Sequence, residues 1–272
     1  MVLSYLGDNK FFEGIFDMKN KLIVSDLDGT LLNSEKIVSE KSIQVLKKCH
    51  EKGFELMVAT ARPPRYVYDS LPNFLQEEFV ICYNGALVLK NREPVYRKGI
   101  SKASALDVLQ EAQDLGFDKL ALEMDDKLYT NFDADVDYGW KPFELVDFQT
   151  LAFDEALKIM ICSDQPMSDE ILTKLPQSCA GVITDNGTLC QIMHADVSKW
   201  NAIKHVVDLL ALREFEVIAF GDDHNDSEMI KNSHVGVAMN NAVSELKESA
   251  DHVTLTNDED GVAVFLEENY VI

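Results

Sequence analysis

The sequence predicts an α/β protein with a Rossmann-like parallel sheet, helices on both faces of that sheet, and an inserted α+β cap domain. Two observations indicate this fold. Short apolar runs alternate with segments of helical spacing up to about residue 85 and again after residue 196, the pattern of parallel strands joined by crossover helices. Between these parts, apolar runs follow one another with few helical segments, as in an antiparallel sheet.

The first part contains three expected strands, the runs KLIVSD, FELMVAT and FVICYNG, which begin at Lys21, Phe54 and Phe79. After the first strand, Ser39 is a candidate helix N-cap, apolar residues follow at helical spacing, and Gly53 ends the helix. The second strand is followed by two prolines, where a helix can begin.

The middle part begins with an expected hairpin, ALVLKNREPVYRK, and a helix from Ser101 to about Leu115 that Gly116 ends. Four strands and a helix near 167–175 come next; the strands are KLALEM, ALKIMIC, GVITDN and TLCQIMH. After residue 197 the alternation resumes with the helix VSKWNAIKHVVDLLAL, the strand FEVIAFGDD, further helices and short strands, and a terminal helix near 259–268.

These patterns divide the chain into an N-terminal extension over residues 1–20, a core made of 21–85 and 196–272, and a cap made of 86–195. The extension lacks the basic start and the long apolar core of a signal peptide. No apolar run in the sequence approaches the roughly 18 residues that a membrane span needs.

Composition excludes several classes of function. With 25 basic and 47 acidic side chains, the chain of 272 residues has a formal charge of −22, which repels nucleic acids and anionic membranes. The five cysteines form no C-x-x-C pair, and we expect reduced thiols in a cytoplasmic protein. Scattered histidines make a zinc site improbable. We expect a monomer or a weak homodimer.

Two aspartates, Asp26 and Asp28, end the first strand and are followed at once by Gly29 and Thr30. Alternation along a strand starts both carboxylates on the same side, where they repel each other and raise each other's proton affinity. A cation is the simplest way to compensate for that repulsion. Gly29 permits a sharp turn, and Thr30 can hold the loop through a local hydrogen bond.

Further motifs occur in order along the chain. After DLDGTLL at 26–32 come VATAR at 58–62, NGA at 84–86, VSKWNAI at 197–203 and GDDHND at 221–226. Together they resemble the four motifs of the haloacid dehalogenase-like phosphohydrolases, in particular the Cof-like branch with a large α/β cap. The resemblance covers nearly everything from residue 21 onward.

The resemblance implies a phosphatase in which Asp26 is the nucleophile that forms an aspartyl phosphate, and Asp28 is the general acid and base. It implies that Thr60 and the backbone of Ala61 bind phosphate oxygens, and that Lys199 offsets the negative charge of the phosphate and of Asp26. These roles agree with what phosphoryl transfer needs, an in-line nucleophile surrounded by positive charge.

For a metal, the resemblance implies Mg²⁺ held by Asp26, Asp222 and the backbone carbonyl of Asp28. Asn225 and Asp226 are expected to orient Lys199 and the metal ligands through hydrogen bonds, although both residues can also cap a helix.

Several positions depart from the family pattern or leave alternatives open. Ala61 replaces a glycine, which costs about 1 kcal/mol if the position requires a positive φ. Trp200 replaces a small residue and either packs in the core or covers the site. Arg62 can reach the substrate or an acidic neighbour. Asp223 adds a charge without an evident role, and His224 is expected in a surface loop.

The leading interpretation is a Mg²⁺-dependent phosphatase acting on a small phosphorylated metabolite such as a sugar phosphate. A closed cavity under a large cap suits such compounds better than phosphoproteins. A phosphomutase of the same superfamily and a non-catalytic phospho-acceptor are the alternatives, whereas dehalogenation requires neither Asp28 as an acid nor Mg²⁺. Four cap residues are candidates to line the cavity: Lys158, Asp185, Asn186 and His194.

Overall fold

A computed structural model describes residues 20–210 and 215–271. Its larger sheet, here the core sheet, has the strand order β16-β15-β14-β1-β2-β3-β4-β5. The pairs from β16 to β3 are parallel, and the β3–β4 and β4–β5 pairs are antiparallel. The strands are β1 (Asn20–Ser25), β2 (Glu55–Ala59), β3 (Phe79–Cys82), β4 (Leu87–Lys90), β5 (Glu93–Arg97), β14 (Phe215–Gly221), β15 (Val235–Ala238) and β16 (His252–Val253).

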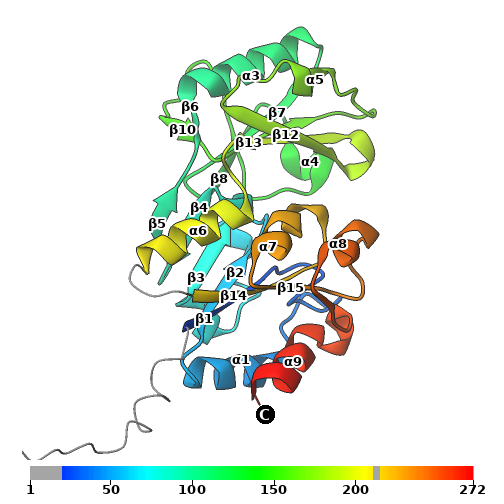
Figure 1. The fold of residues 1–272 in the computed structure, drawn as a ribbon. Coiled ribbons are helices and arrows are strands. Elements are labelled where there is room, and N and C mark those ends of the chain that lie inside the picture. Colours follow the sequence, from blue (N-terminus) through cyan, green and yellow to red (C-terminus); the bar gives the residue numbers. More distant parts are fainter. Residues whose placement is uncertain (1–19, 211–214, 272) are drawn as a thin grey trace, which may run out of the picture.

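Helices cover both faces of this sheet, as the sequence predicts (Figure 1). Helices α1 and α9 contact each other on one face, while α6, α7 and α8 form a row on the other. The helices of this part are α1 (Glu40–Glu51), α2 (Asn73–Gln76), α6 (Lys199–Leu209), α7 (Ser227–Asn232), α8 (Ser244–Ser249) and α9 (Gly261–Leu266). At α1, the expected N-cap is confirmed, because the Ser39 hydroxyl accepts the N–H of Ser42.

A second sheet, here the cap sheet, has the strand order β12-β13-β11-β7-β8-β9 and is antiparallel except for the β8–β9 pair. Its strands are β7 (Lys119–Met124), β8 (Lys127–Thr130), β9 (Glu144–Leu145), β11 (Lys158–Cys162), β12 (Cys179–Thr184) and β13 (Leu189–His194). The accompanying helices are α3 (Lys102–Asp114), α4 (Ala134–Tyr138) and α5 (Glu170–Thr173). This sheet corresponds to the expected α+β cap.

The connections to the cap correct one expectation. The sequence assigns everything from residue 86 to the cap, but β4 and β5 extend the core sheet. The physical reason is that the chain turns back beside β3, through a left-handed Asn84, and continues the same sheet. Two short strands, β6 (Ile100–Ser101) and β10 (Glu155–Ala156), pair with each other in a separate small sheet. We therefore propose that the cap extends from β6 to β13.

Each sheet has its own apolar core. In the cap, alternate residues of β11 point to opposite faces, so Ile159 and Ile161 join the cluster under α3, and Met160 and Cys162 lie on the other face. All five cysteines are buried and free, as expected. None of the helices that the structure describes has the length and apolar character needed to cross a membrane. The expected extension over residues 1–20 lies outside the described residues except for Asn20.

The inner strands of the core sheet dominate its stability, which yields a first prediction. Ile81 on β3 is fully buried in the core cluster, so Ile81→Ala is expected to cost about 2–5 kcal/mol of unfolding free energy through lost packing and a residual cavity. Val95 on edge strand β5 is 40% exposed, so Val95→Ala serves as the control. Equal shifts in the midpoint of urea unfolding for the two variants would contradict this assignment of the core.

Candidate active site

Three neighbouring strands deliver the predicted polar residues to one edge of the core sheet. Strands β14, β1 and β2 are adjacent and parallel, and Asp222, Asp26 and Thr60 each directly follow one of them. The carboxyl ends of parallel strands therefore meet at one place, where open α/β sheets bind ligands.

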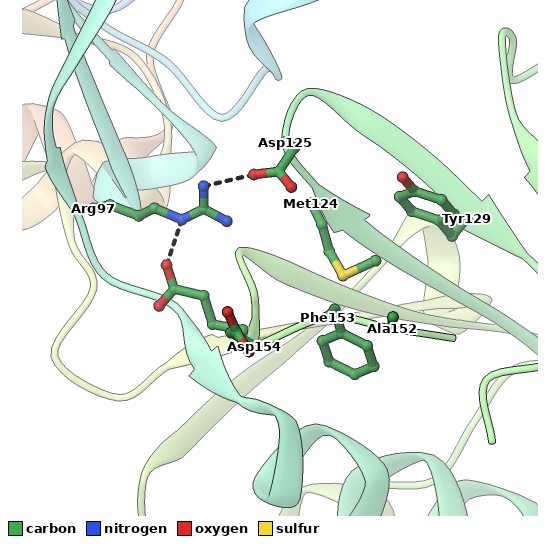
Figure 2. Close-up of a pocket in the computed structure, with 8 residues that line it drawn as sticks. Arg97, Met124, Asp125, Tyr129, Ala152, Phe153 and Asp154 are labelled. Carbon is green, nitrogen blue, oxygen red and sulfur yellow. Dashed lines mark hydrogen bonds and ion pairs between the residues drawn. The ribbon is translucent and has the colours of Figure 1, made fainter. Parts of the chain in front are cut away.

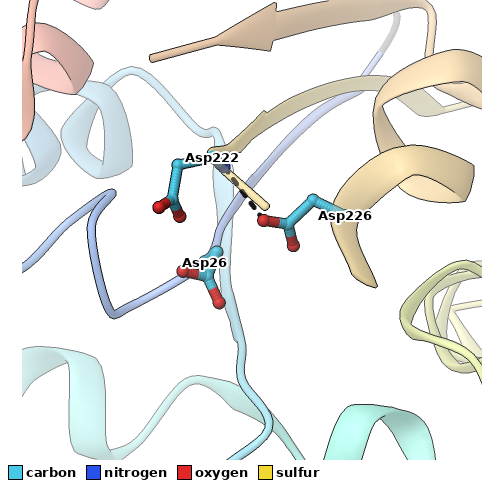
Figure 3. A group of neighbouring side chains, drawn as sticks. All are labelled: Asp26, Asp222 and Asp226. Carbon is cyan, nitrogen blue, oxygen red and sulfur yellow. Dashed lines mark hydrogen bonds between the residues drawn. The ribbon is translucent and has the colours of Figure 1, made fainter. Parts of the chain in front are cut away.

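Three carboxylates converge there (Figure 3). Ligand atoms of Asp26, Asp222 and Asp226 lie within 4.8 Å of one another. The ammonium of Lys199 lies 2.6 Å from Asp26 Oδ1 and 2.6 Å from Asp226 Oδ1, and this lysine is almost completely buried. Three carboxylates against one ammonium leave two negative charges, which a divalent cation would neutralise. The hard oxygen donors of the cluster fit such a cation.

Asp226 organises the loop in addition to holding Lys199. Its Oδ2 accepts the backbone N–H groups of Asp222 and Asp223, at 3.0 and 3.2 Å. Asn225 takes a different part from the expected one, because its amide donates to Asn84 and no bond to Lys199 is found among the described residues. Of the two residues expected to orient Lys199, Asp226 is therefore the one that bonds it among the described residues.

The turn after β1 is built around Asp222. Gly29 has φ +81°, and a Cβ on it would lie 2.2 Å from Asp222 Oδ2. The hydroxyl of Thr30 donates to Asp222 Oδ1 at 2.9 Å, so it fixes a carboxylate in the site in addition to shaping its own loop. The expected sharp turn at Gly29 is confirmed, and the reason is both the backbone angle and the close approach of Asp222.

Asp28 points toward two cations. Arg62 donates to both of its carboxylate oxygens, at 2.6 and 2.5 Å, and Lys36 Nζ lies 2.8 Å from Oδ1. Asp28 is thus an acidic neighbour of the kind that the sequence left as one of two alternatives for Arg62. Partial burial opposes ionisation of Asp28, but the hydrogen bonds from Arg62 and Lys36 outweigh it and lower the pKa of the carboxyl.

The phosphate-binding candidates form the loop after β2. The Thr60 hydroxyl is buried and accepts the N–H of Arg62 at 3.2 Å, which fixes the loop. Ala61 is not among the residues with positive φ, so the alanine brings no backbone strain at this position. Trp200 packs against the core cluster, as one of its two interpretations predicts. Asp223 caps the short turn in which the exposed His224 lies.

Burial shapes the protonation of the cluster. It raises the pKa of Asp26 to about 8, with Lys199 opposing the shift and Asp226 adding to it. Burial also raises the pKa of Asp222 to about 6, where the hydrogen bond from Thr30 opposes and the neighbouring aspartates add. For Lys199, burial favours the neutral amine, but Asp226 and Asp26 outweigh it and raise the pKa. Without a metal, the cluster thus tends to hold extra protons.

Two of the cavities that touch the cap bear on substrate binding. The larger, about 510 Å³, lies where Arg97 of β5 pairs with Asp125 and with Glu155 of β10, and the catalytic candidates do not line it (Figure 2). A smaller cavity of about 190 Å³ touches the loop after β2. Of the four cap candidates, Lys158 lines this smaller cavity, and Asp185, Asn186 and His194 do not.

Some contacts have no signal in the sequence. Lys36 reaches Asp28, and Arg65 forms a buried double hydrogen bond with Glu123 across 58 positions of the chain. Asn84, which holds Asn225, lies in the NGA motif and could have been found from it. Ion pairs between distant loops depend on the tertiary fold and leave no local spacing to recognise.

Comparison with known proteins identifies the family. A model of the haloacid dehalogenase-like hydrolases matches residues 23–266. The chain belongs to this family. The 5-amino-6-(5-phospho-D-ribitylamino)uracil phosphatase YcsE of Bacillus subtilis (strain 168) is 30% identical to it over 252 residues, 91% of this chain and 94% of the relative. The present chain, as a haloacid dehalogenase-like hydrolase, is likewise a phosphatase.

Solved structures share the fold. A haloacid dehalogenase-like hydrolase from Bacteroides thetaiotaomicron is 28% identical with a TM-score of 0.80, covering 93% of this chain and 100% of that one. The sugar phosphatase BT4131, of subclass IIB of the haloacid dehalogenase superfamily, has a TM-score of 0.76 at 22% identity, covering 93% and 100%, and is alike in fold. The family and the α/β fold with its cap are thus as the sequence predicts.

The proton-holding cluster predicts a link between pH and metal binding. The pKa values of Asp26 and Asp222 are raised from 3.8 to about 8 and about 6 in the folded protein, so between pH 4 and 8 the unfolded chain binds fewer protons there. In the presence of a chelator, the contribution of these two groups to the free energy of unfolding therefore falls as pH rises through that range. We expect Mg²⁺ to raise the melting temperature more at pH 8 than at pH 6, because at pH 6 it must displace protons.

Differential scanning calorimetry in chelator and in millimolar Mg²⁺ checks this expectation. Asp26→Asn removes the group with the largest shift, so it should reduce the pH dependence of the Mg²⁺ effect. An equal Mg²⁺-induced shift at pH 6 and pH 8 in the unmodified protein would rule out the proposed linkage.

Proposed function

We propose that this phosphatase is Mg²⁺-dependent and hydrolyses a small phosphorylated metabolite, a sugar phosphate or a similar compound, through an aspartyl phosphate on Asp26. The observation that carries the proposal is the cluster of Asp26, Asp222 and Asp226 beside Lys199, in which three carboxyl groups stand against one ammonium. Asp26, Asp222 and the Asp28 carbonyl would hold Mg²⁺, which would supply positive charge beside the phosphate.

The first chemical step forms a bond between an Asp26 carboxylate oxygen and phosphorus, and the bond from phosphorus to the substrate oxygen breaks. Asp28 gives its proton to the departing alkoxide, which leaves as an alcohol. Lys199, the Thr60 hydroxyl and the Ala61 backbone N–H would bind the phosphate oxygens and stabilise their charge in the transition state.

The second step hydrolyses the aspartyl phosphate. Asp28, now ionised, takes a proton from water, the water oxygen bonds to phosphorus, and the bond from phosphorus to Asp26 breaks. Inorganic phosphate leaves and Asp28 is protonated again. Because Arg62 and Lys36 favour the ionised carboxylate, Asp28 must leave these partners, or be partly released from them, before it can donate a proton.

Other features support the remaining parts of the proposal. The name of YcsE describes a phosphatase of a phosphorylated ribityl compound, and BT4131 is called a sugar phosphatase, so small polyhydroxylated phosphates are the class to test. Five free buried thiols are compatible with a reducing compartment, and we propose a cytoplasmic location. The formal charge of −22 argues against nucleic acid as a partner.

Asp26→Asn is expected to abolish phosphate release, because the amide oxygen is a poor nucleophile and cannot neutralise Lys199 as a carboxylate does. The measurement is phosphate release from sugar phosphates, polyol phosphates, nucleotides and cofactor phosphates, with Mg²⁺ and with chelator. Asp208→Asn, an exposed position on α6, is the matched control and should keep full activity. Metal-independent release, or release that survives Asp26→Asn, would overturn the proposed mechanism.

Asp28→Asn is expected to lower kcat for alkyl monophosphates by about 10²- to 10⁴-fold, the usual contribution of a general acid and base. The lost proton transfer affects both steps, so rapid-quench experiments should detect no efficient turnover of the aspartyl phosphate. Full activity of this variant would refute the role given to Asp28. A doubly phosphorylated sugar in the same assay separates hydrolysis from phosphomutase activity, because a mutase transfers phosphate without releasing it.

A further inference from the structure

Lys158 is a buried cation that the proposed reaction does not use. It begins β11, is 6% exposed, and shares with Met160 the face of the cap sheet that is turned away from α3. Its ammonium lies 3.5 Å from the carbonyl oxygen of Ala61, in the candidate phosphate loop. A cap residue thus reaches the loop that follows β2 of the core sheet.

Strand register brings two polar residues beside Lys158. Glu123 of β7 is directly opposite it, and Gln191 of β13 is opposite Met160 and therefore diagonal to Lys158. Gln191 Oε1 accepts a hydrogen bond from the ammonium at 3.0 Å, and its Nε2 donates to Thr184 at 3.1 Å, which fixes the orientation of the amide.

Glu123 is already engaged by other groups. It accepts two hydrogen bonds from Arg65, at 2.8 and 2.6 Å, and one from the Tyr83 hydroxyl at 3.2 Å. Lys158 therefore has no direct carboxylate partner among the described residues, and burial lowers its pKa, with Glu123 opposing and Arg65 adding to the shift. The ammonium has two oxygen acceptors and lies 6.0 Å from the centre of the Tyr83 ring, so one of its three N–H groups has no oxygen acceptor among these contacts and can donate to a ligand.

Lys158 lines a small cavity that has two aromatic side chains, Tyr66 and Trp140, in its wall. Lys158, Gln191, Met160 and Trp140 all line the space of about 190 Å³ that touches the loop after β2. Trp140 is held in place by stacking on Tyr138, with 4.8 Å between ring centroids. The volume is below the roughly 300 Å³ at which pockets for drug-sized ligands begin, so it suits one small ring or a short chain.

We propose that Lys158, Gln191 and Trp140 form the leaving-group site and that this site selects a single sugar or polyol unit; the inference rests on the proposed function. A sugar hydroxyl accepts from Lys158 and donates to Gln191 Oε1, and the C–H face of the sugar packs on the Trp140 ring. A nucleoside unit, with both a ribose and a base, exceeds the space. Lys158 is therefore a specificity-determining residue that acts on KM for polyhydroxylated substrates.

The test compares Lys158→Met with the unmodified phosphatase on two kinds of substrate. Sugar and polyol monophosphates place a leaving group in the site, and acetyl phosphate has almost none. For sugar and polyol monophosphates we expect KM to rise by about tenfold or more, because a hydrogen bond from a charged group is lost, while kcat stays nearly unchanged. For acetyl phosphate, kcat/KM should change less than about threefold, a difference below 1 kcal/mol. Lys119→Met, on the same sheet but paired with Asp137 and Asp164, is the matched control.

The outcomes separate this inference from the proposed function. An unmodified protein that releases phosphate from no substrate, acetyl phosphate included, defeats the proposed function and the inference with it. An active enzyme in which Lys158→Met affects both substrate kinds equally, or neither, defeats the inference alone. A preference of the unmodified enzyme for nucleotides over sugar and polyol phosphates also defeats the inference alone. If Lys158→Met does not fold, Gln191→Leu and Trp140→Ala must show the same selective rise in KM.

Discussion

The active site depends on one electrostatic constraint, a buried ammonium shared by two carboxylates with a third nearby. Lys199 bonds Asp26 and Asp226 at 2.6 Å each, at a site with almost no solvent to screen the charges. A single cation cannot balance two buried carboxylates and a half-buried third, so the cluster favours taking up protons or another cation. The site therefore favours added positive charge, which supports the proposed divalent metal and the charge stabilisation that phosphoryl transfer needs.

The fold meets this constraint with close backbone contacts that only glycine permits. A Cβ on Gly29 would lie 2.2 Å from an Asp222 oxygen, and one on Gly221 would lie 2.5 Å from the Cβ of Asp226. The strand ends and the absence of side chains at these two glycines thus position the carboxylates. Placing the carboxylates costs little further conformational entropy once the sheet has formed. The same architecture explains why the polar residues come from motifs that are distant in sequence, since adjacent parallel strands bring them together.

Sequence alone predicted the elements and the residues of the strand ends, because these follow from local periodicity and from ordered motifs. It assigned the hairpin at 87–97 to the wrong sheet, since apolar alternation does not specify which edge a strand joins. It did not predict the bond from Asn225 to Asn84 and left Arg62 open, because both side chains bond residues that only the tertiary fold brings near. Of its four cap candidates, Lys158 alone lines the cavity that touches the loop after β2.

Contacts between cap and core meet at the loop after β2. Residues 60–66 include Thr60, the phosphate-binding candidate, and also Arg62, which pairs with Asp28, the Ala61 carbonyl, which accepts from Lys158, and Arg65, which pairs with Glu123 of the cap. A leaving group that accepts a hydrogen bond from Lys158 would bind beside the segment whose Arg62 holds Asp28 ionised. We infer that recognition of the alcohol by the cap and release of Asp28 from Arg62 can be coupled through this one loop.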